Sequence, residues 1–522
     1  SARADDAWEV YIPGSTIKGA FRRRASQVLR TLWGETRRTA EVIDYLFGVQ
    51  GQRGAIQFYD AYLVDPKAPD QAWCSMDGVK MNPRTGQPIE TAKQDFLFAY
   101  GDTLAFQLQL DLQDLGEADL EALAVFGHLL RDFQAGDIVL GGEKTSGFGW
   151  VTATIDEVEW LTGATGGISR QLFGQAAFSR AGIWHRLHLE RAEAATGLKI
   201  FAPLTAERAA SRPPKAQAGF VSHREFGGYC GTLAIEVDTL TPTHVRESGE
   251  PSYSAALDGG SVYGWDAFSM GPPAAEDRPD QRVYALPSRS LKGMLRQVYT
   301  IASDARAEST DLANLNPADS LFGWVGAGAN QSIMGRLVFS FALFEPQPAL
   351  AWYALPYPYN GWRFHNGQWE ERRGNGVPQV RIADQWRVFQ HAPLAPIVRQ
   401  RASFQPDTAQ ANYVRAILPG QRAHFTLRFW NLAQEELQRL FWCVELEPTL
   451  AHKLGRGRHL GFGSLRLRIL PASYLIDWGS RYAAATEAAG LTPLALEQWR
   501  SPQGQGIAYL GELRQSLDAQ SL

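Results

Sequence analysis

Cysteine is scarce in this sequence, and the few cysteines are scattered. Cys74, Cys230 and Cys443 stand far apart, and no two of them form a CxxC pair. This spacing argues against a disulfide framework and against a structural zinc site. It suits a reducing compartment, so we expect a cytoplasmic protein.

Long apolar runs and an excess of basic residues are missing as well. No apolar stretch is long enough to span a membrane, and the opening residues, SARADD, do not resemble a signal peptide. The net charge of −4 argues against a bulk polyanion binder, because such domains are often strongly basic. Local basic patches are still compatible with this charge. With 522 residues the chain is too long for one core, so two or three domains are expected.

A basic helix is predicted near the start of the chain. Pro13 and Gly14 break regular structure, and Ser15 is a good helix N-cap. Lys18 and the arginines at 22–24 follow in the first two turns, where the helix macrodipole prefers acids. An arrangement that costs helix stability is usually kept for a ligand, and the free N–H groups of a helix start suit a phosphate. The alternative is a solvated basic face.

The second half of the chain repeats this stretch. Residues 286–296 share with residues 12–22 the frame apolar-Pro-small-x-Ser/Thr-apolar-Lys-Gly, with an arginine four residues after the lysine. Three further elements recur in the same order, which chance does not readily produce. They are Leu46–Gly48 with Leu321–Gly323, Arg53–Phe58 with Gly335–Phe339, and the glycine loops Gly142–Gly149 with Gly457–Ser464.

The hydrophobic patterns predict the same order of elements in both halves. The first half should contain a helix, two strands, a helix and a strand at 17–33, 54–64, 103–112, 118–131 and 150–160. The second half should contain a strand, a helix, two strands, a helix and a strand at 231–242, 290–302, 335–344, 422–430, 432–446 and 464–470. This β-α-β-β-α-β order predicts an α+β fold of two ferredoxin-like modules. The missing first strand of the first half would come from residues before Ser1, which we favour, or from Trp184–Glu190.

The chain is therefore divided into four parts. The first module spans 1–160, a connector spans 161–225, the second module spans 226–470, and a mostly helical tail spans 471–522. Large insertions at 66–95 and 345–418 occupy equivalent places in the two modules.

The glycine loops supply the second set of candidate ligand-binding residues. Glycine lets a backbone approach a ligand closely and offer N–H donors. Phe148 and Phe462 would either stack on a base or anchor the loops in the core. Cations and backbone donors without a base-reading pattern fit a nucleic-acid backbone, above all single-stranded RNA. The candidate RNA-binding residues are Gly14, Ser15, Lys18, Arg22, Arg23, Lys144, Ser146, Gly147, Phe148, Ser288, Arg289, Ser290, Lys292, Arg296, Arg456, Arg458, His459, Gly461 and Phe462.

The motif helix, the Leu-Phe-Gly, the strand after it and the Gly-Phe-Gly loop resemble the RAMP superfamily. More narrowly, they resemble the Cas-seven-type backbone subunits of type III CRISPR effector complexes, and the two copies resemble the fused double-backbone subunits of the type III-D group. The resemblance implies RRM-like modules that bind CRISPR RNA and present single-stranded target RNA. Its implied protein partners are neighbouring backbone subunits and the large Cas-ten-type subunit. The insertions would be thumbs, whose Met81 or Ile89 either wedges between bases or packs within a hairpin.

Catalysis is also implied by the resemblance alone. In active members an aspartate before the motif helix supports cleavage of target RNA with Mg²⁺ or another divalent ion. The candidates here are Asp6 in the first half and Asp258 or Asp266 in the second, and no metal ligands are assigned. Each aspartate has the alternative of being a solvated loop residue. The chain would then be a non-catalytic RNA scaffold, whereas a Cas-six-type processing nuclease is disfavoured by the doubled Lys-Gly helix motif.

Overall fold

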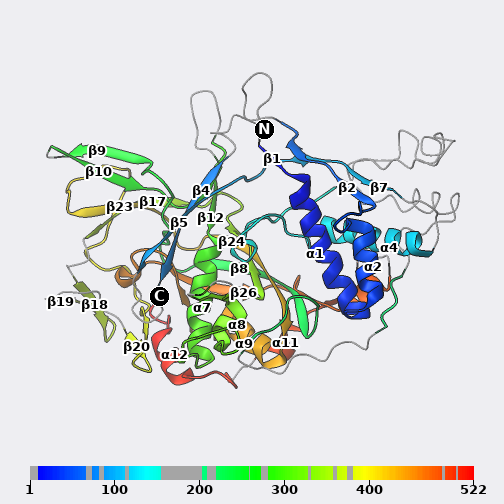
Figure 1. Cartoon of the computed structure of the whole chain (residues 1–522). Helices are drawn as coiled ribbons and strands as arrows, with labels where there is room; N and C mark the ends of the chain where they lie inside the picture. The colour runs from blue at the N-terminus through cyan, green and yellow to red at the C-terminus, as the bar shows by residue number, and fades with distance from the viewer. Residues whose placement is uncertain are drawn as a thin grey trace.

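The two halves of the chain form two groups of helices on opposite sides of the computed structural model (Figure 1). The structure describes residues 10–65, 73–81, 88–111, 117–154, 203–207, 219–257, 259–271, 280–326, 328, 331–356, 361–372, 380–484, 488–500 and 504–522. The helices of the first half are α1 (Gly14–Trp33), α2 (Arg37–Phe47) and α4 (Glu117–Gln134). Those of the second module are α7 (Ser288–Ala302), α8 (Pro317–Phe322) and α9 (Gln434–Glu445).

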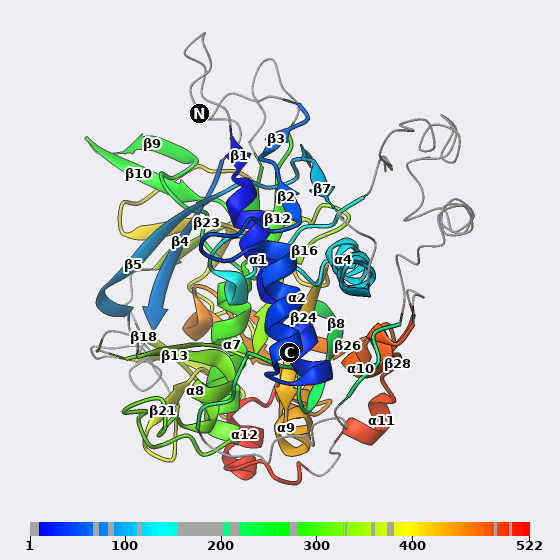
Figure 2. The same cartoon turned by 45° about the vertical axis from the view of Figure 1, so that its right-hand side comes forward.

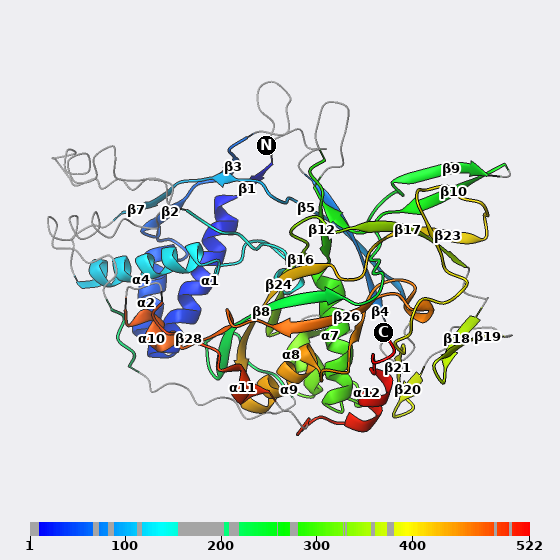
Figure 3. The ribbon, with the colours of Figure 1, turned by 180° about the vertical axis from the view of Figure 1, so that it is seen from behind.

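An antiparallel sheet forms the centre of the second module (Figure 3). Its central strands have the order β12-β16-β24-β8-β26, and β15 also pairs with β24. Alternate residues of β8 are fully buried, and the apolar side chains of α7 recur at helical spacing, so both elements bury one face in the same core. The bounds of these strands are Tyr229–Thr239 (β8), Val283–Leu286 (β12), Leu337–Phe339 (β15), Ala342–Leu343 (β16), Arg422–Leu432 (β24) and Ser464–Ile469 (β26).

The strands of the first module are shorter than predicted. Two small sheets, β1-β3-β6 and β2-β7, replace the two continuous strands expected at 54–64 and 103–112. Residues 150–154, where a last strand was expected, have no regular structure, and the rest of that prediction lies outside the described residues. The bounds are Tyr11–Ile12 (β1), Ile56–Phe58 (β2), Ala61–Leu63 (β3), Leu104–Ala105 (β6) and Leu108–Leu110 (β7).

The start of α1 differs from the predicted cap. Pro13, with an extended backbone, occupies the N-cap position, so Ser15 already lies inside the helix. The first free N–H group of the helix, that of Gly14, donates to the Asp60 carboxylate over 2.7 Å. The side chain of Asp60, between β2 and β3, thus accepts the hydrogen bond that was expected to go to Ser15.

A long hairpin of the first half reaches across to the second module (Figure 2). It consists of β4 (Cys74–Met81) and β5 (Pro88–Phe98). Met76 is buried against residues of the second module, and the Asp77 carboxylate pairs with Arg246 at 2.9 Å. The insertion predicted at 66–95 therefore helps to hold the two modules together.

The insertion at 345–418 and the segment at 253–265 of the second module together form one five-stranded sheet. Its order is β22-β17-β23-β10-β9, with bounds Arg399–Arg401, Leu350–Pro356, Ala411–Ile417, Gly260–Trp265 and Tyr253–Leu257. The remaining short strands are β11 (Ser269–Met270), β13 (Gly323–Val325), β14 (Ser332–Met334), β18 (Gly361–His365), β19 (Gln368–Arg372), β20 (Val380–Ile382), β21 (Trp386–Val388) and β25 (His452–Lys453).

The described part of the tail is more mixed than the mostly helical segment predicted. A strand, β27 (Tyr474–Ile476), pairs with β8 and with β28 (Leu491–Pro493). The helices α10 (Trp478–Tyr482), α11 (Leu496–Trp499) and α12 (Leu510–Ser516) are short. Because Trp478 and Tyr482 are buried in the core of the first module, the tail joins the two modules.

A buried ionic cluster lies where this tail meets the first module. The Asp132 carboxylate accepts from Nε of Arg24 over 2.7 Å and from the hydroxyl of Tyr482. Burial alone would raise the pKa of Asp132, but the charges of Arg24, Arg131 and Arg481 hold it below its usual range. The carboxylate therefore compensates guanidinium groups that would otherwise be buried without a counter-charge.

We expect Asp132→Asn to lower the free energy of unfolding by about 3–5 kcal/mol, because it leaves buried arginines short of a counter-charge. Urea unfolding followed by circular dichroism measures this. The matched control is Asp44→Asn, which breaks the half-exposed pair with Arg22 and should cost about 1 kcal/mol or less. Equal losses in the two variants would contradict this account of the cluster.

Candidate nucleic-acid interface

The three consecutive arginines of α1 have three different environments. Arg22 donates to the Gly48 carbonyl over 2.7 Å and pairs with Asp44 at 3.1 Å. Arg24 is buried in the ionic cluster described above. Arg23 alone of the three is exposed, and it makes a weak contact of 3.8 Å with the sulfur of Met334. Only Arg23 of this run is therefore available to an anion.

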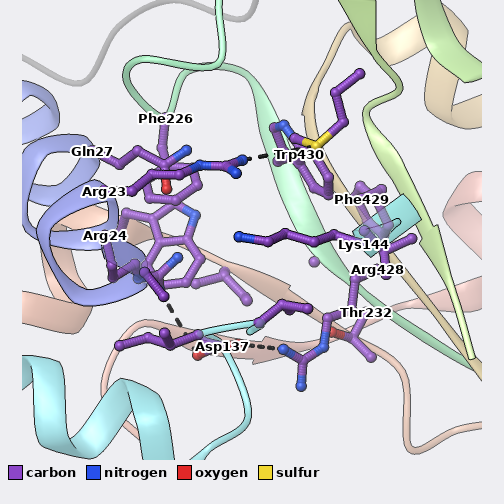
Figure 4. Close-up of a pocket in the computed structure, with 18 residues that line it drawn as sticks. Arg23, Arg24, Gln27, Asp137, Lys144, Phe226, Thr232, Arg428, Phe429 and Trp430 are labelled. Carbon is purple, nitrogen blue, oxygen red and sulfur yellow. Dashed lines mark hydrogen bonds and ion pairs between the residues drawn. The ribbon is translucent and has the colours of Figure 1, made fainter. Parts of the chain in front are cut away.

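Arg23 lines a pocket between the two modules (Figure 4). The pocket has a volume of about 110 Å³, and its walls come from α1, the loop at 137–144 and strands β8 and β24. Lys144, from the first glycine loop, extends into the pocket toward α1 (Figure 4). Trp430 and Phe429 lie on the side of the pocket opposite α1 (Figure 4). The motif helix and the glycine loop, which were predicted separately, thus meet at one site.

The charges in this pocket are not balanced. Among the described residues, no carboxylate pairs with Arg23 or with Lys144. Burial, followed by the charge of Arg24, lowers the pKa of Arg23, and burial, followed by the charge of Arg23, lowers the pKa of Lys144. The acid in the wall, Asp137, already pairs with Arg428 at 3.0 Å. An anion placed between Arg23 and Lys144 would relieve their repulsion.

An open groove continues from this pocket along α1. It has a volume of about 370 Å³ and shares Arg23, Gln27 and Met334 with the pocket. Two further arginines, Arg30 and Arg224, lie along it together with His223, whose pKa is lowered to about 4 by burial and which is therefore neutral at pH 7. The groove and the pocket together form a basic path across the junction of the modules.

Gln27, Arg224 and Trp430 carry no sequence signal of this role. They stand outside the repeated motifs, and they reach the site only because α1, the segment before β8 and β24 pack together. Only the arginine-rich run and the glycine loop were recognisable in advance.

The helix with the second copy of the motif, α7, has a different environment from α1, the helix with the first copy. The first glycine loop, which contains the short 3-10 helix η1 (Lys144–Ser146), packs on the start of α7. The Ser288 hydroxyl donates to the Ser146 carbonyl, and the Lys292 ammonium donates to the Thr145 hydroxyl over 3.1 Å. Arg289 pairs with Glu143 at 2.7 Å. These contacts occupy the polar groups of Ser288, Arg289 and Lys292, which were predicted to bind RNA. Of the other two predicted residues, Ser290 is half-buried and Arg296 pairs with Asp319.

Gly147 shows how tightly the loop and α7 approach one another. Its φ is +85°, and a Cβ at this position would lie 2.7 Å from Cβ of Ser288 and 2.6 Å from the Phe339 carbonyl oxygen. Any other residue would combine backbone strain with a steric clash. The glycine is therefore explained by contact between the modules.

The phenylalanines of the two glycine loops pack against other aromatic side chains of the protein, Phe148 half-buried and Phe462 fully buried. Phe148 contacts Phe96, Phe98 and Phe341 with ring centroids 5.2–6.0 Å apart. Phe462 has 0% of its surface exposed and meets Tyr353 edge to face at 5.2 Å. This is the anchoring arrangement, and it leaves no exposed face of Phe462 for a base.

The basic residues of the second glycine loop are covered by the insertion of their own module. Arg456 donates to the Asn412 side chain over 2.9 Å, and Arg458 lies 4.4 Å from the ring centre of Phe389. Burial, with the charges of Arg458 and Lys453, lowers the pKa of His459 to about 4. His459 is therefore neutral at pH 7 and adds no charge for a phosphate.

The one candidate catalytic aspartate that the structure describes is Asp266, since Asp6 and Asp258 lie outside the described residues. Asp266 is 1% exposed, and its carboxylate pairs with Arg282 at 3.1 Å and with Arg415 at 3.3 Å. The Tyr284 hydroxyl donates to the same carboxylate over 3.2 Å. A carboxylate with two guanidinium partners does not fit a divalent ion, which would compete with both.

No group of three or more His, Cys, Asp or Glu side chains is arranged to hold a metal ion within the described ranges. The proposed thumb residues Met81 and Ile89 lie in β4 and β5, but their side chains are outside the described part of the chain. None of the described helices is both long and apolar enough to cross a membrane.

Comparison with known proteins gives one family. The model of the RAMP superfamily matches residues 9–152 and 236–466. No curated protein matches the chain. Among the solved structures that match is a chain titled "Type IV-B CRISPR Complex", with 13% identity, 46% of this chain and 91% of that chain covered, and a TM-score of 0.26. Another is the crystal structure of Thermofilum pendens Csc2, with 13% identity, coverage of 55% and 86%, and a TM-score of 0.25.

The buried Lys292 at the junction of the modules should make stability depend on pH. Burial, followed by the charge of Arg296, lowers the pKa of Lys292 to about 7, whereas an unfolded lysine has a pKa of about 10.4. Between these values the unfolded chain binds more protons, so this lysine makes stability rise with pH. The wild type should therefore gain stability relative to Lys292→Met between about pH 7 and about pH 10.

Urea unfolding over this pH range measures the difference between the two proteins. Thr145→Val is the matched control, because it removes the hydrogen-bond acceptor of Lys292 but keeps the ammonium group, and it should keep the pH dependence. A wild-type advantage over Lys292→Met that stays constant or shrinks as the pH rises would show that Lys292 does not titrate in this range.

Proposed function

The family match covers more than half of the chain, so this protein belongs to the RAMP superfamily, and we propose that it is an RNA-binding backbone subunit of a CRISPR effector complex. The observation that carries the proposal is the meeting of Arg23 and Lys144 in the pocket between the modules, where neither has an acidic partner among the described residues. A phosphate of the RNA backbone supplies the missing negative charge, and the ligand would be CRISPR RNA.

The groove that extends from the pocket suits a single strand. Its basic side chains follow α1, and basic grooves bind the backbone of single-stranded nucleic acids without reading the sequence. Trp430 lies in the wall of the pocket beside these cations. The finer assignment, to two ferredoxin-like modules of a type III-D-like double backbone subunit, rests on the repeated motifs and on the order β16-β24-β8-β26 in the second module.

For the second module we propose a scaffold role for Asp266 rather than a catalytic one. The buried Asp266 joins strand β10 to Arg282 and Arg415, and this explains its position without any reaction. If the assembled complex cleaves target RNA with Mg²⁺, Asp258 or Asp6 is the better candidate in this chain. Target RNA, neighbouring backbone subunits and a Cas-ten-type subunit are the partners that this proposal includes.

The first test is RNA binding by the double variant Arg23→Ala/Lys144→Ala. Loss of two phosphate contacts should weaken binding of labelled CRISPR RNA and reduce the slope of log affinity against log salt by about 1.4, at about 0.7 for each contact with a single strand. Fluorescence anisotropy at several salt concentrations measures both quantities.

The matched control is Arg37→Ala/Arg399→Ala, which removes the same charge from exposed side chains away from the pocket. It should leave the salt slope close to that of the wild type. If the two double variants change the slope equally, binding follows net charge and the pocket has no special role.

The second test concerns cleavage by the assembled complex with Mg²⁺. Asp266→Asn should leave the ladder of target-RNA products unchanged while it lowers the thermal stability of the chain, because it breaks two buried ion pairs. Asp258→Asn is compared in the same assay. Loss of a single cut in Asp266→Asn, with guide RNA still bound, would refute the scaffold role of Asp266.

A further inference from the structure

The pocket between the modules contains more than a phosphate requires. More than half of the residues that line it are apolar, and the aromatic ones are Phe226, Phe429, Trp430 and Trp478. A phosphate is bound by cations and N–H groups and gains nothing from aromatic walls. An apolar and aromatic pocket with a few polar groups is typical of sites that bind an organic ring.

Of these aromatic residues, Trp430 is the one that is open to a ligand. The rings of Phe226 and Trp478 stack on each other with centroids 4.5 Å apart, and the guanidinium of Arg24 lies 4.2 Å from the centre of the Trp478 ring. Phe429 is 2% exposed. Trp430 is half-buried, and no aromatic ring of the described residues lies flat against it.

A hydrogen bond fixes the orientation of Trp430. Its indole N–H donates to Nδ1 of His223 over 2.8 Å, and the backbone carbonyl of His223 accepts from the Gln27 side chain of α1 over 2.7 Å. The polar atom of the indole is therefore already used. The part of Trp430 that remains for a ligand is the face of its ring, which suits stacking.

A buried hydroxyl without a partner lies in the same wall of the pocket. Thr232 is 6% exposed, and its Oγ1 has no hydrogen-bond partner among the described residues. Such a hydroxyl costs free energy, because it has lost water and gained nothing in return. Thr232 pairs across the sheet with Arg428, and Trp430 follows two residues later on β24. The free hydroxyl and the indole therefore line the pocket from one sheet.

The opposite wall of the pocket is α1, which contributes Ala20, Arg23 and Gln27. Because Arg23 and Gln27 also line the open groove, they mark the place where the groove enters the pocket. A strand that follows the groove therefore passes Arg23 at this entrance. A phosphate bound there would have its own base beside the aromatic wall.

We propose that the pocket binds one nucleobase of the RNA, which stacks on Trp430 and forms a hydrogen bond with Thr232, while its phosphate lies between Arg23 and Lys144. The proposal rests on the proposed function and adds a base site to the phosphate site. Stacking accepts every base, because each has a flat face. The Thr232 hydroxyl both donates and accepts, so it does not select one base.

The test compares RNA with and without bases. The probes are a labelled oligouridylate and a labelled oligomer of the same length that consists of abasic ribose phosphates, so both carry the same charge. Trp430→Ala should weaken binding of the oligouridylate about tenfold, because one stacking contact is lost, and should not change binding of the abasic oligomer. Fluorescence anisotropy at several salt concentrations should give an unchanged salt slope, because no charge is removed.

Two further variants serve as controls for Trp430→Ala. Trp430→Phe keeps an aromatic face and should restore most of the lost affinity. Trp369→Ala removes another half-buried tryptophan, whose indole N–H donates to the Pro393 carbonyl outside the pocket, and should bind both probes like the wild type.

Thr232→Val tests the hydroxyl separately, because it keeps the shape of the side chain. It should weaken binding of the oligouridylate about fivefold, through loss of one hydrogen bond, and should not change binding of the abasic oligomer. The melting temperature of the free protein should stay the same or rise, because the hydroxyl has no partner to lose. A lower melting temperature would show that the hydroxyl is already bonded in the free protein and would refute its assignment to a base.

The two probes also separate this proposal from the proposed function. Equal losses for both probes in Trp430→Ala, or no loss for either, would overturn the base site. If Arg23→Ala/Lys144→Ala still reduces the salt slope for both probes, the phosphate site remains without a base site. A salt slope that this double variant leaves unchanged would instead refute the phosphate site and, with it, the arrangement proposed for the base.

Discussion

The packing of the first glycine loop on the start of α7 is the contact on which the remaining features of this protein depend. The same loop that gives its Ser146 carbonyl to Ser288 also places Lys144 in the pocket with Arg23. Phe148 anchors the loop in the hairpin β4–β5, which itself rests on the second module. A shift of this loop would therefore have two effects at once: it would separate the cations of the pocket, and it would loosen the junction of the modules.

Local charge balance explains how an acidic chain can present a site for an anion. The acids near the pocket are already engaged, since Asp132 and Asp137 compensate Arg24, Arg428 and Arg481. Arg23 and Lys144 remain without an acidic partner among the described residues. Net charge describes the whole surface, whereas binding of a phosphate depends on which cations have no counter-charge of their own.

Sequence patterns predicted those parts of the fold that are local. The helices near 290–302 and 434–445 and the strands around β8 and β24 show clear periodicity and were placed to within a few residues. The five-stranded sheet was not predictable, because it pairs residues 260–265 with 411–417, far apart in the sequence. Arg23 and Lys144 were each recognised from their motifs, but their meeting depends on how the two modules pack, which no local pattern encodes.

The repeats also show why motifs of similar sequence do not make the same contacts. The starts of α1 and α7 share their motif, yet Arg289 pairs with Glu143 of a glycine loop while the equivalent Ser15 lies exposed. The two loops share a backbone conformation, yet one joins the modules and the other is covered by residues 391–398. The local sequence sets the shape of each motif, and its neighbour in the fold sets what the motif binds.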